Sequence, residues 1–303
     1  MSQESAATFN PSALFESIHQ QTYPNATLYI IATPIGNSAD ISLRALHVLH
    51  IADAVACEDT RNTAQLLTRY GLHKPLIAAH MHNEHEVAEK IIQRLQAGER
   101  IALVSDAGTP AISDPGAIIV DAVRQAGLRV SPLPGASAAI SALSASGLVN
   151  DRFYFVGFLP SKAGQRDTCL QALITIPATL IFYEAPHRIT ESTKALLDNF
   201  GPDRRVVFAR EITKLFEEIH RCTLAEAIDW LAQDPHREKG EYVVLVEGMP
   251  EADSDDLFEA KRVLEILLGE LSVKQAANLA AQITGKKKNA LYQIALEMKA
   301  NDE

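Results

Sequence analysis

Three loops of this 303-residue chain combine glycine, proline and small side chains, and each directly follows a short apolar stretch. The loops are Thr33–Asn37, Ser105–Gly116 and Pro134–Ala138. Glycine and alanine allow a ligand to approach the backbone, and proline keeps a loop stiff. Each loop taken singly is also compatible with an ordinary tight turn. At one edge of a sheet, the three together would form a rigid pocket lined mainly by main-chain groups.

The common nucleotide-binding motifs are missing from the sequence. No G-x-G-x-x-G follows the first apolar stretch, and G-x-x-x-x-G-K-[ST] does not occur. These motifs bring backbone N–H groups to a pyrophosphate or triphosphate. A dinucleotide dehydrogenase and a P-loop enzyme are therefore disfavoured, and the predicted pocket is not a conventional phosphate site.

Candidates for proton transfer begin with two adjacent carboxylates, Glu58 and Asp59, which follow a predicted buried strand. Paired carboxylates can raise one pKa enough to make a general base, with Arg61 holding the other as an anion. A helix cap with an Arg–Glu ion pair explains the same residues without catalysis. Other candidates near predicted loops are His82, Glu84, Arg188 and Lys214. Arg188 and Lys214 are better suited to hold phosphate than to act as bases, since arginine stays protonated.

His80 and His82 have a spacing that superficially suits a metal ion, because alternate residues of a strand point the same way. No further cysteine or carboxylate motif completes such a site. We therefore expect no metal. Substrate contact, general-base duty and a structural hydrogen bond all stay open for His82.

Composition is that of an ordinary soluble globular protein, with 47% apolar and 22% charged residues. Three cysteines far apart in the chain fit a reducing cytoplasm and exclude a disulfide framework. The polar start, residues 1–27, lacks the apolar core of a signal peptide, and no apolar run is long enough to span a bilayer. The net charge of −10 argues against nucleic-acid binding unless basic residues are concentrated locally.

Apolar stretches and helical patterns alternate along the chain, which predicts an α/β fold with a mainly parallel first sheet. Functional loops are then expected at the carboxyl ends of the strands. A change of texture near residues 149–152 predicts a second, mixed α/β lobe. After Pro250 an acidic linker, Glu251–Asp256, precedes three helices without strands, which is typical of a small helix-turn-helix unit. The predicted domains are an N-terminal extension (1–27), a first lobe (28–150), a second lobe (151–250) and a helical tail (251–303).

The three loops resemble the cofactor loops of the tetrapyrrole-methylase-like (class III) methyltransferases. Several longer segments are similar to those family members that 2′-O-methylate a cytidine of bacterial small-subunit ribosomal RNA. The resemblance covers about Leu28 to Gly248 and the helical tail. Its segments include 35–37, 40–46, 57–61, 82–84, 105–116, 182–188, 209–214 and 240–242.

The resemblance implies a bilobal enzyme, usually a homodimer, which binds S-adenosylmethionine between its lobes. It also implies the cofactor contacts, which are Pro34, Ile35, Gly36, Ala107, Gly108, Thr109, Ile112, Ser137, Ala138, Glu184, Ala185, Ile212 and Thr213. Relatives have an Asp where this chain has Thr109, so a threonine hydroxyl here replaces the carboxylate that relatives offer to the cofactor ribose. For catalysis we expect Glu58, Asp59, Arg61 and His82, and for substrate contact Arg188 and Lys214.

The tail concentrates positive charge in an acidic chain. Lys286, Lys287 and Lys288 stand between its last two predicted helices, where phosphate contact is favourable. Lys162–Arg166 and Arg204-Arg205 are candidates to extend this basic track. The resemblance implies small-subunit ribosomal RNA, free or in the assembled subunit, as the partner, and the lysines are where we expect it to bind. We also expect a cytoplasmic location. The alternatives are a porphyrinoid C-methyltransferase, which has no use for the lysines, and a non-catalytic RNA-binding assembly factor.

Overall fold

The computed structural model describes residues 11–249, 258–286 and 288–301. Its chain forms two compact units. The first contains the residues up to Ala145 together with the later segment Ala209–Ile219, and the second contains Ser146–Phe208 and the chain from His220 onward. The predicted linker Glu251–Asp256 and Lys287 lie outside the described residues.

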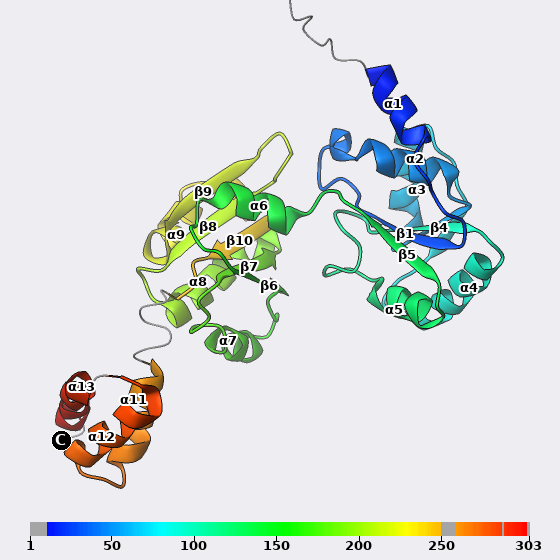
Figure 1. Ribbon diagram of the computed structural model, residues 1–303. Coiled ribbons are helices and arrows are strands. Elements are labelled where there is room, and N and C mark those ends of the chain that lie inside the picture. The colour runs from blue at the N-terminus through cyan, green and yellow to red at the C-terminus, as the bar shows by residue number, and fades with distance from the viewer. Residues whose placement is uncertain (1–10, 250–257, 287, 302–303) are drawn as a thin grey trace, which may run out of the picture. The chain divides into compact units, whose positions relative to one another are not determined.

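The first unit is built on a five-stranded sheet with the order β3-β2-β4-β1-β5 (Figure 1). Every strand pair in it is parallel, which confirms the predicted first sheet. The strands are β1 (Thr27–Ile31), β2 (Ala54–Cys57), β3 (Leu76–Ala78), β4 (Arg100–Val104) and β5 (Arg129–Leu133). The helices are α1 (Pro11–His19), α2 (Leu43–Ile51), α3 (Thr60–Arg69), α4 (Glu84–Gln96), α5 (Ala117–Gln125) and α6 (Ala138–Ser146), with a short 3-10 turn η1 (Ser38–Asp40).

Alternate side chains of the strands enter two separate cores, one on each face of this sheet. In β4, Ile101 and Leu103 pack with α4 and α5, whereas Ala102 and Val104 pack with α2 and α3. Figure 1 shows these two helix pairs on opposite sides of the sheet. Strands buried on both faces read as continuous apolar runs, which is why the sequence predicts them.

The order of the strands decides where the three loops meet. Because β4, β1 and β5 are parallel neighbours, their carboxyl ends lie at the same edge of the sheet. The loops Ser105–Gly116, Thr33–Asn37 and Pro134–Ala138 leave from these three ends in turn. The fold thus brings together the loops that the sequence analysis singled out.

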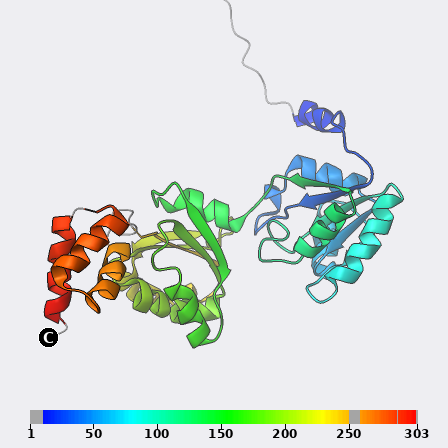
Figure 2. The same cartoon turned by 60° about the horizontal axis from the view of Figure 1, so that its bottom comes forward.

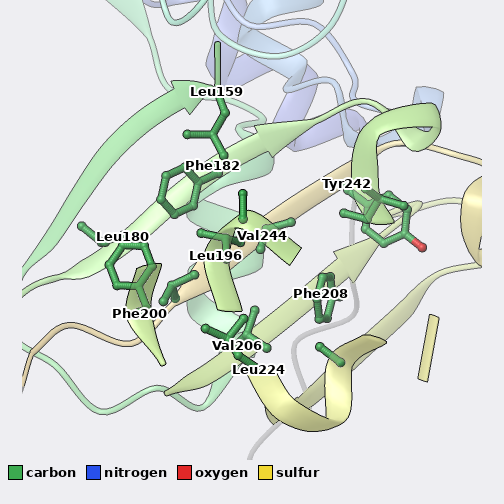
Figure 3. Close-up of a cluster of buried hydrophobic side chains, with 14 of the residues drawn as sticks. Leu159, Leu180, Phe182, Leu196, Phe200, Val206, Phe208, Leu224, Tyr242 and Val244 are labelled. Atoms are coloured by element: carbon green, nitrogen blue, oxygen red, sulfur yellow. The ribbon is translucent and has the colours of Figure 1, made fainter. Parts of the chain in front are cut away.

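The second unit contains a mixed five-stranded sheet with the order β6-β7-β10-β8-β9, as expected for the second lobe. β6 is parallel to β7, and β10 is antiparallel to β7. Its core joins large side chains such as Phe182, Phe200 and Phe208 (Figure 3). The elements are β6 (Phe153–Phe158), α7 (Ala163–Gln171), β7 (Thr179–Glu184), η2 (Pro186–Arg188), α8 (Ile189–Phe200), β8 (Arg205–Arg210), β9 (Glu218–Thr223), α9 (Leu224–Ala232), η3 (Pro235–Glu238) and β10 (Tyr242–Val246).

Strand β9 was not predicted from the sequence. Its residues, EIHRCT, contain no apolar run, and none of them is fully buried. β9 is an edge strand, which pairs with a neighbouring strand along one side only and commonly carries charged side chains. Hydrogen bonding to β8, and not residue composition, therefore defines this strand.

The tail forms a small helical unit with its own core, as predicted. Its helices are α11 (Phe258–Leu268), α12 (Val273–Thr284) and α13 (Lys288–Asn301), and Figure 2 shows them in orange and red, packed against one another. They bury Leu264, Ala277 and Leu291 among other small and apolar residues. Gly285 has a φ of 71° and so ends α12 in the left-handed conformation that glycine adopts without strain. None of the helices described is both long and apolar enough to cross a membrane.

Candidate active site

Hydrogen bonds join the three loops at the carboxyl edge of the first sheet. Thr33 and Gly108 exchange backbone hydrogen bonds of 2.9 and 3.0 Å, and the Thr33 hydroxyl donates to the Ser105 carbonyl at 3.0 Å. The Thr109 hydroxyl donates to the Ala136 carbonyl of the third loop at 2.9 Å. The loops therefore form one connected surface. The hydroxyl proton of Thr109 is donated to a group of this surface, and the hydroxyl oxygen can still accept a hydrogen bond.

The small residues of these loops are needed for close approach. A Cβ at Gly135 would lie 2.7 Å from the Cβ of Ala32, and Gly108 has a φ of 82°. Ala111 and Ser113 also adopt positive φ, which is uncommon for residues other than glycine. Such backbone strain persists only where the surrounding structure holds it. The second loop thus has one specific backbone conformation and is not an ordinary turn.

The turn between β8 and β9 packs on the first loop, although the two are more than 170 residues apart in sequence. The amide of Asn37 donates to the Thr213 hydroxyl at 3.2 Å. A Cβ at Gly36 would lie 2.6 Å from Cγ of Lys214 and 2.9 Å from Oγ1 of Thr213. Of the predicted cofactor residues, Ile212 and Thr213 therefore lie on a turn that contacts the Pro34–Gly36 loop.

The third loop leads directly into helix α6, which begins at Ala138. The Ser137 carbonyl accepts the amide of Ser141, so Ser137 stands at the first turn of the helix. The N–H groups of a first helical turn have no partner within the helix, and the helix dipole is positive there. The predicted cofactor residues Ser137 and Ala138 thus occupy a place suited to a carboxylate group.

Asp59 has the helix-cap role that the sequence analysis left open. Its carboxylate accepts the Arg61 amide at 2.8 Å, at the start of α3, and pairs with the Arg61 guanidinium at 2.7 Å. The Arg61 side chain and these hydrogen bonds lower the pKa of Asp59 to about 2. Such a carboxylate is a weak base near neutral pH.

Glu58 belongs to a group of carboxylates that only the tertiary structure brings together. Burial raises the pKa of Glu58, and the charges of Asp106 and Asp59 raise it further. The pKa of Asp114 rises to about 6, through burial first and then through the charge of Glu58. Asp106 accepts the Asn62 amide group at 2.7 Å.

The sequence analysis did not select Asp106 and Asp114, although both lie in the second loop. Their signal was the presence of two carboxylates within a loop of small residues. Both Glu58 and Asp114 hold a proton more readily than ordinary carboxyl groups, and this suits proton transfer near neutral pH.

Glu84 is a structural residue. It is 6% exposed, and its Oε2 accepts the amides of Gly116 at 2.9 Å and Ile118 at 3.2 Å. Those amides lie at the start of helix α5, and the N-cap residue Gly116 has no side chain that could accept their hydrogen bonds. Glu84 therefore joins the first turn of α4 to the end of the second loop.

The histidine pair lies in the turn between β3 and α4. The ring centroids of His80 and His82 are 6.2 Å apart, and the side chain of Asn83 accepts the His80 amide at 2.8 Å. His82 is exposed. Over the described part of the chain, no group of three or more His, Cys, Asp or Glu side chains is arranged to hold a metal ion.

In the second unit, Glu184 ends β7 and is 3% exposed. Its carboxylate accepts the Ala185 amide at 2.8 Å and the Ser192 hydroxyl. Arg188 donates to the carbonyls of Leu159 and Pro160 at 2.7 and 3.2 Å, and its side chain is 18% exposed. Arg188 thus holds the loop after β6, and a substrate contact would use only its remaining donors.

Among the residues expected to extend the basic track, Lys162 is exposed, whereas the three arginines make contacts within the second unit. The Arg166 side chain is 4% exposed and pairs with Glu191 at 2.6 Å. Arg205 pairs with Glu247, and Arg204 donates to the Glu247 carbonyl at 3.1 Å. These guanidinium groups are engaged within the unit. In the tail, Lys288 opens α13 and is exposed, and Lys286 is half-buried.

A family model described as Tetrapyrrole (Corrin/Porphyrin) Methylases matches residues 27–228, which include all the loops described above. The chain belongs to this family. A second model, described as RsmI C-terminal HTH domain, matches residues 251–299 of the chain. The resemblance noted in the sequence is thereby confirmed.

Curated relatives are similar to this chain along most of their length. Ribosomal RNA small subunit methyltransferase I of Pseudomonas aeruginosa is 54% identical over 273 residues, which cover 89% of this chain and 97% of that protein. The protein of the same name from Escherichia coli O157:H7 is 51% identical over 270 residues, covering 89% and 94%.

Solved structures of two methyltransferases share the fold. Cobalt precorrin-4 methyltransferase superposes with a TM-score of 0.54 and 19% identity, over 73% of this chain and 95% of its own. Uroporphyrin-III C-methyltransferase from Thermus thermophilus, complexed with S-adenosylhomocysteine, has a TM-score of 0.51 and 16% identity, over 73% and 97%. At these identities the likeness concerns the fold alone.

Proposed function

We propose that this protein transfers a methyl group from S-adenosylmethionine to the 2′-hydroxyl of a cytidine in small-subunit ribosomal RNA. The observation that carries the proposal is the identity of 54% to ribosomal RNA small subunit methyltransferase I over 89% of the chain. The connected surface of three loops supplies the physical support, because it offers main-chain groups to a small ligand. The modified nucleotide and the atom that accepts the methyl group are proposed from the resemblance noted in the sequence.

The residues present fit a positively charged cofactor. Three carboxylates, those of Glu58, Asp106 and Asp114, gather at the edge where the loops meet. Their charge favours the sulfonium and ammonium groups of S-adenosylmethionine and opposes polyphosphate nucleotides. The first turn of α6, at Ala138, suits the carboxylate of the same molecule.

The proposed cofactor contacts stay those predicted from the sequence. They divide into loop residues of the first unit, the turn that packs on the first loop, and Glu184 with Ala185 of the second unit. When bound, the cofactor supplies an electrophilic methyl carbon. Since both carboxylate oxygens of Glu184 already accept hydrogen bonds, we assign its contact to the backbone.

Proton transfer is assigned to Glu58 together with Asp114. Methyl transfer joins the acceptor oxygen to the methyl carbon, breaks the carbon–sulfur bond and releases the hydroxyl proton. A carboxylate with a raised pKa receives that proton more readily than an ordinary one. Asp59 and Arg61 then fix the loop after β2. His82, which is exposed in the turn after the neighbouring strand β3, contacts the substrate.

RNA contact is assigned to Lys214 in the turn that packs on the first loop, to Arg188 in the second unit, and to Lys286, Lys287 and Lys288 in the tail. A homodimer in the bacterial cytoplasm is part of the same proposal. Concentrated lysines in a chain of net charge −10 can hold phosphate locally while the rest of the surface repels it. Binding should therefore weaken as salt increases.

One experiment tests the reaction and its alternatives. S-adenosylmethionine carrying a labelled methyl group is incubated with the protein and with small ribosomal subunits from a strain that lacks the corresponding gene. Primer extension at low nucleotide concentration then maps any 2′-O-methyl group. Label on a cytidine ribose is the expected result. Label on an added porphyrinoid, with none on RNA, would assign C-methylation instead. Binding of RNA without any transfer would indicate an assembly factor.

A further inference from the structure

Two large apolar side chains project from the turn between β8 and β9. Leu215 is 89% exposed and Phe216 is 68% exposed. The preceding residues of the same turn, from Glu211 to Lys214, are half-buried. The turn thus has an anchored half, which contacts the first loop through Thr213 and Lys214, and a projecting half, which is Leu215–Phe216.

The anchored half is held by several polar contacts. The Lys214 ammonium pairs with Glu211 at 2.8 Å, and the Thr213 amide donates to the Glu217 carboxylate at 2.7 Å. Glu211 and Thr213 have φ values of 50° and 67°, so the backbone has a specific, strained conformation. Ordering Leu215 and Phe216 therefore costs less on binding than it would in a flexible loop.

We propose that Leu215–Phe216 is a platform on which a base of single-stranded RNA stacks, so that its ribose is held next to the first loop. This inference rests on the proposed function, which requires a nucleotide to leave the RNA fold before its 2′-hydroxyl reaches the cofactor loops. Exposed bases commonly stack on aromatic side chains. Phe216 supplies the flat apolar face, and Leu215 widens it.

The size of the platform favours a base over a protein partner. An aromatic side chain buries about 150–250 Å², whereas a stable protein interface buries about 800 Å² on each partner. The pair Leu215–Phe216 matches one or two bases in area. The neighbouring carboxylates of Glu211 and Glu217 accept hydrogen bonds within the turn, which weakens their repulsion of an approaching phosphate backbone.

The test compares Phe216→Ala, Phe216→Trp and Phe216→Leu in the full-length protein. Small ribosomal subunits are the methyl acceptor, and a fluorescent single-stranded oligonucleotide reports RNA affinity by anisotropy. Stacking is worth about 1–3 kcal/mol per base, so Phe216→Ala should raise KM for the subunit and the oligonucleotide Kd by roughly 5- to 150-fold. Phe216→Trp should restore binding, and Phe216→Leu should not. Phe15→Ala, which removes a ring that is 47% exposed in α1, is the matched control.

Two further measurements separate the platform from other roles of the same residues. Calorimetry with S-adenosylmethionine should give the same Kd for Phe216→Ala and the wild type, and sedimentation should give the same mass. An equal loss of cofactor affinity, a changed mass, or an unchanged oligonucleotide Kd would each overturn the platform. If the wild type transfers no methyl group to subunits, the proposed function fails instead, and the anisotropy result still decides whether Phe216 binds RNA.

Discussion

Glu84 offers a quantitative test of how the second loop is held in place. Its carboxylate accepts the amides of Gly116 and Ile118 at 2.9 and 3.2 Å, and the residue is 6% exposed. A hydrogen bond to a charged group is worth about 1.5–3 kcal/mol, and a buried donor left without a partner costs about 1–3 kcal/mol. Water can reach part of the space left by Glu84→Ala. We therefore expect that variant to lose about 2–4 kcal/mol of local stability.

Glu84→Gln separates hydrogen bonding from charge. The amide oxygen can still accept both N–H groups, whereas the charge at the first turn of α5 is lost. That charge is worth about 0.3–2 kcal/mol. The expected loss for Glu84→Gln is therefore about 1 kcal/mol. Glu86→Ala in the same helix is the control, because the Glu86 side chain is 69% exposed and its pairing with Lys90 contributes little.

Hydrogen exchange measured by mass spectrometry reports this local stability directly. Peptides that span Gly116–Val120 should exchange roughly 30- to 1,000-fold faster in Glu84→Ala, since about 1.4 kcal/mol corresponds to a factor of ten. Trp230, the single tryptophan, lies in the core of the second unit, so its fluorescence transition should not change. Equal exchange in Glu84→Ala and Glu86→Ala would refute the capping role of Glu84.

Three further predictions concern pH, packing and salt. The raised pKa of Asp114 makes the native protein lose stability as pH rises through about 6. Asp114→Asn should therefore stabilise the first unit at pH 8 and have no effect below about pH 4, as measured by circular dichroism. Gly36→Ala should destabilise that unit by about 1–3 kcal/mol in urea titrations, because the new Cβ overlaps Lys214 and Thr213. Replacing Lys286 and Lys288 by Ala should lower the slope of log K for RNA against log salt by about 0.7–0.9 for each phosphate that the protein no longer neutralises, with unchanged cofactor affinity in calorimetry. Lys90→Ala, on the exposed face of α4, is the control for this removal of positive charge.

The positions of the cofactor loops could be predicted because their signals are local. Each loop follows a β-branched apolar run and contains glycine or proline within a few residues, so neither signal needs knowledge of distant contacts. The parallel order of β4, β1 and β5 then placed the three loops at one edge. Strand β9 was not predicted, because its residues, EIHRCT, contain no run of apolar side chains.

The roles of charged residues were harder to predict than the positions of the loops. Arg166 and Arg204 are basic in sequence and were expected on an RNA-binding track, yet both are engaged within the second unit. Glu84 was a candidate for proton transfer and proved to cap a helix 32 residues away. A long charged side chain can reach several hydrogen-bond or ion-pair partners, and the partner that it contacts depends on which elements the fold brings near.

By itself, the sequence determined the alternation of strands and helices, the composition of the three loops and the concentration of lysines in the tail. These properties are encoded in runs of about ten residues, where side-chain periodicity and backbone preference act directly. Only the tertiary structure decided that Asp114 lies near Glu58 and that the turn at Thr213 packs on Gly36. Electrostatic and packing energies depend on distance in space, so residues 56 and 177 positions apart acquire a shared role only after folding.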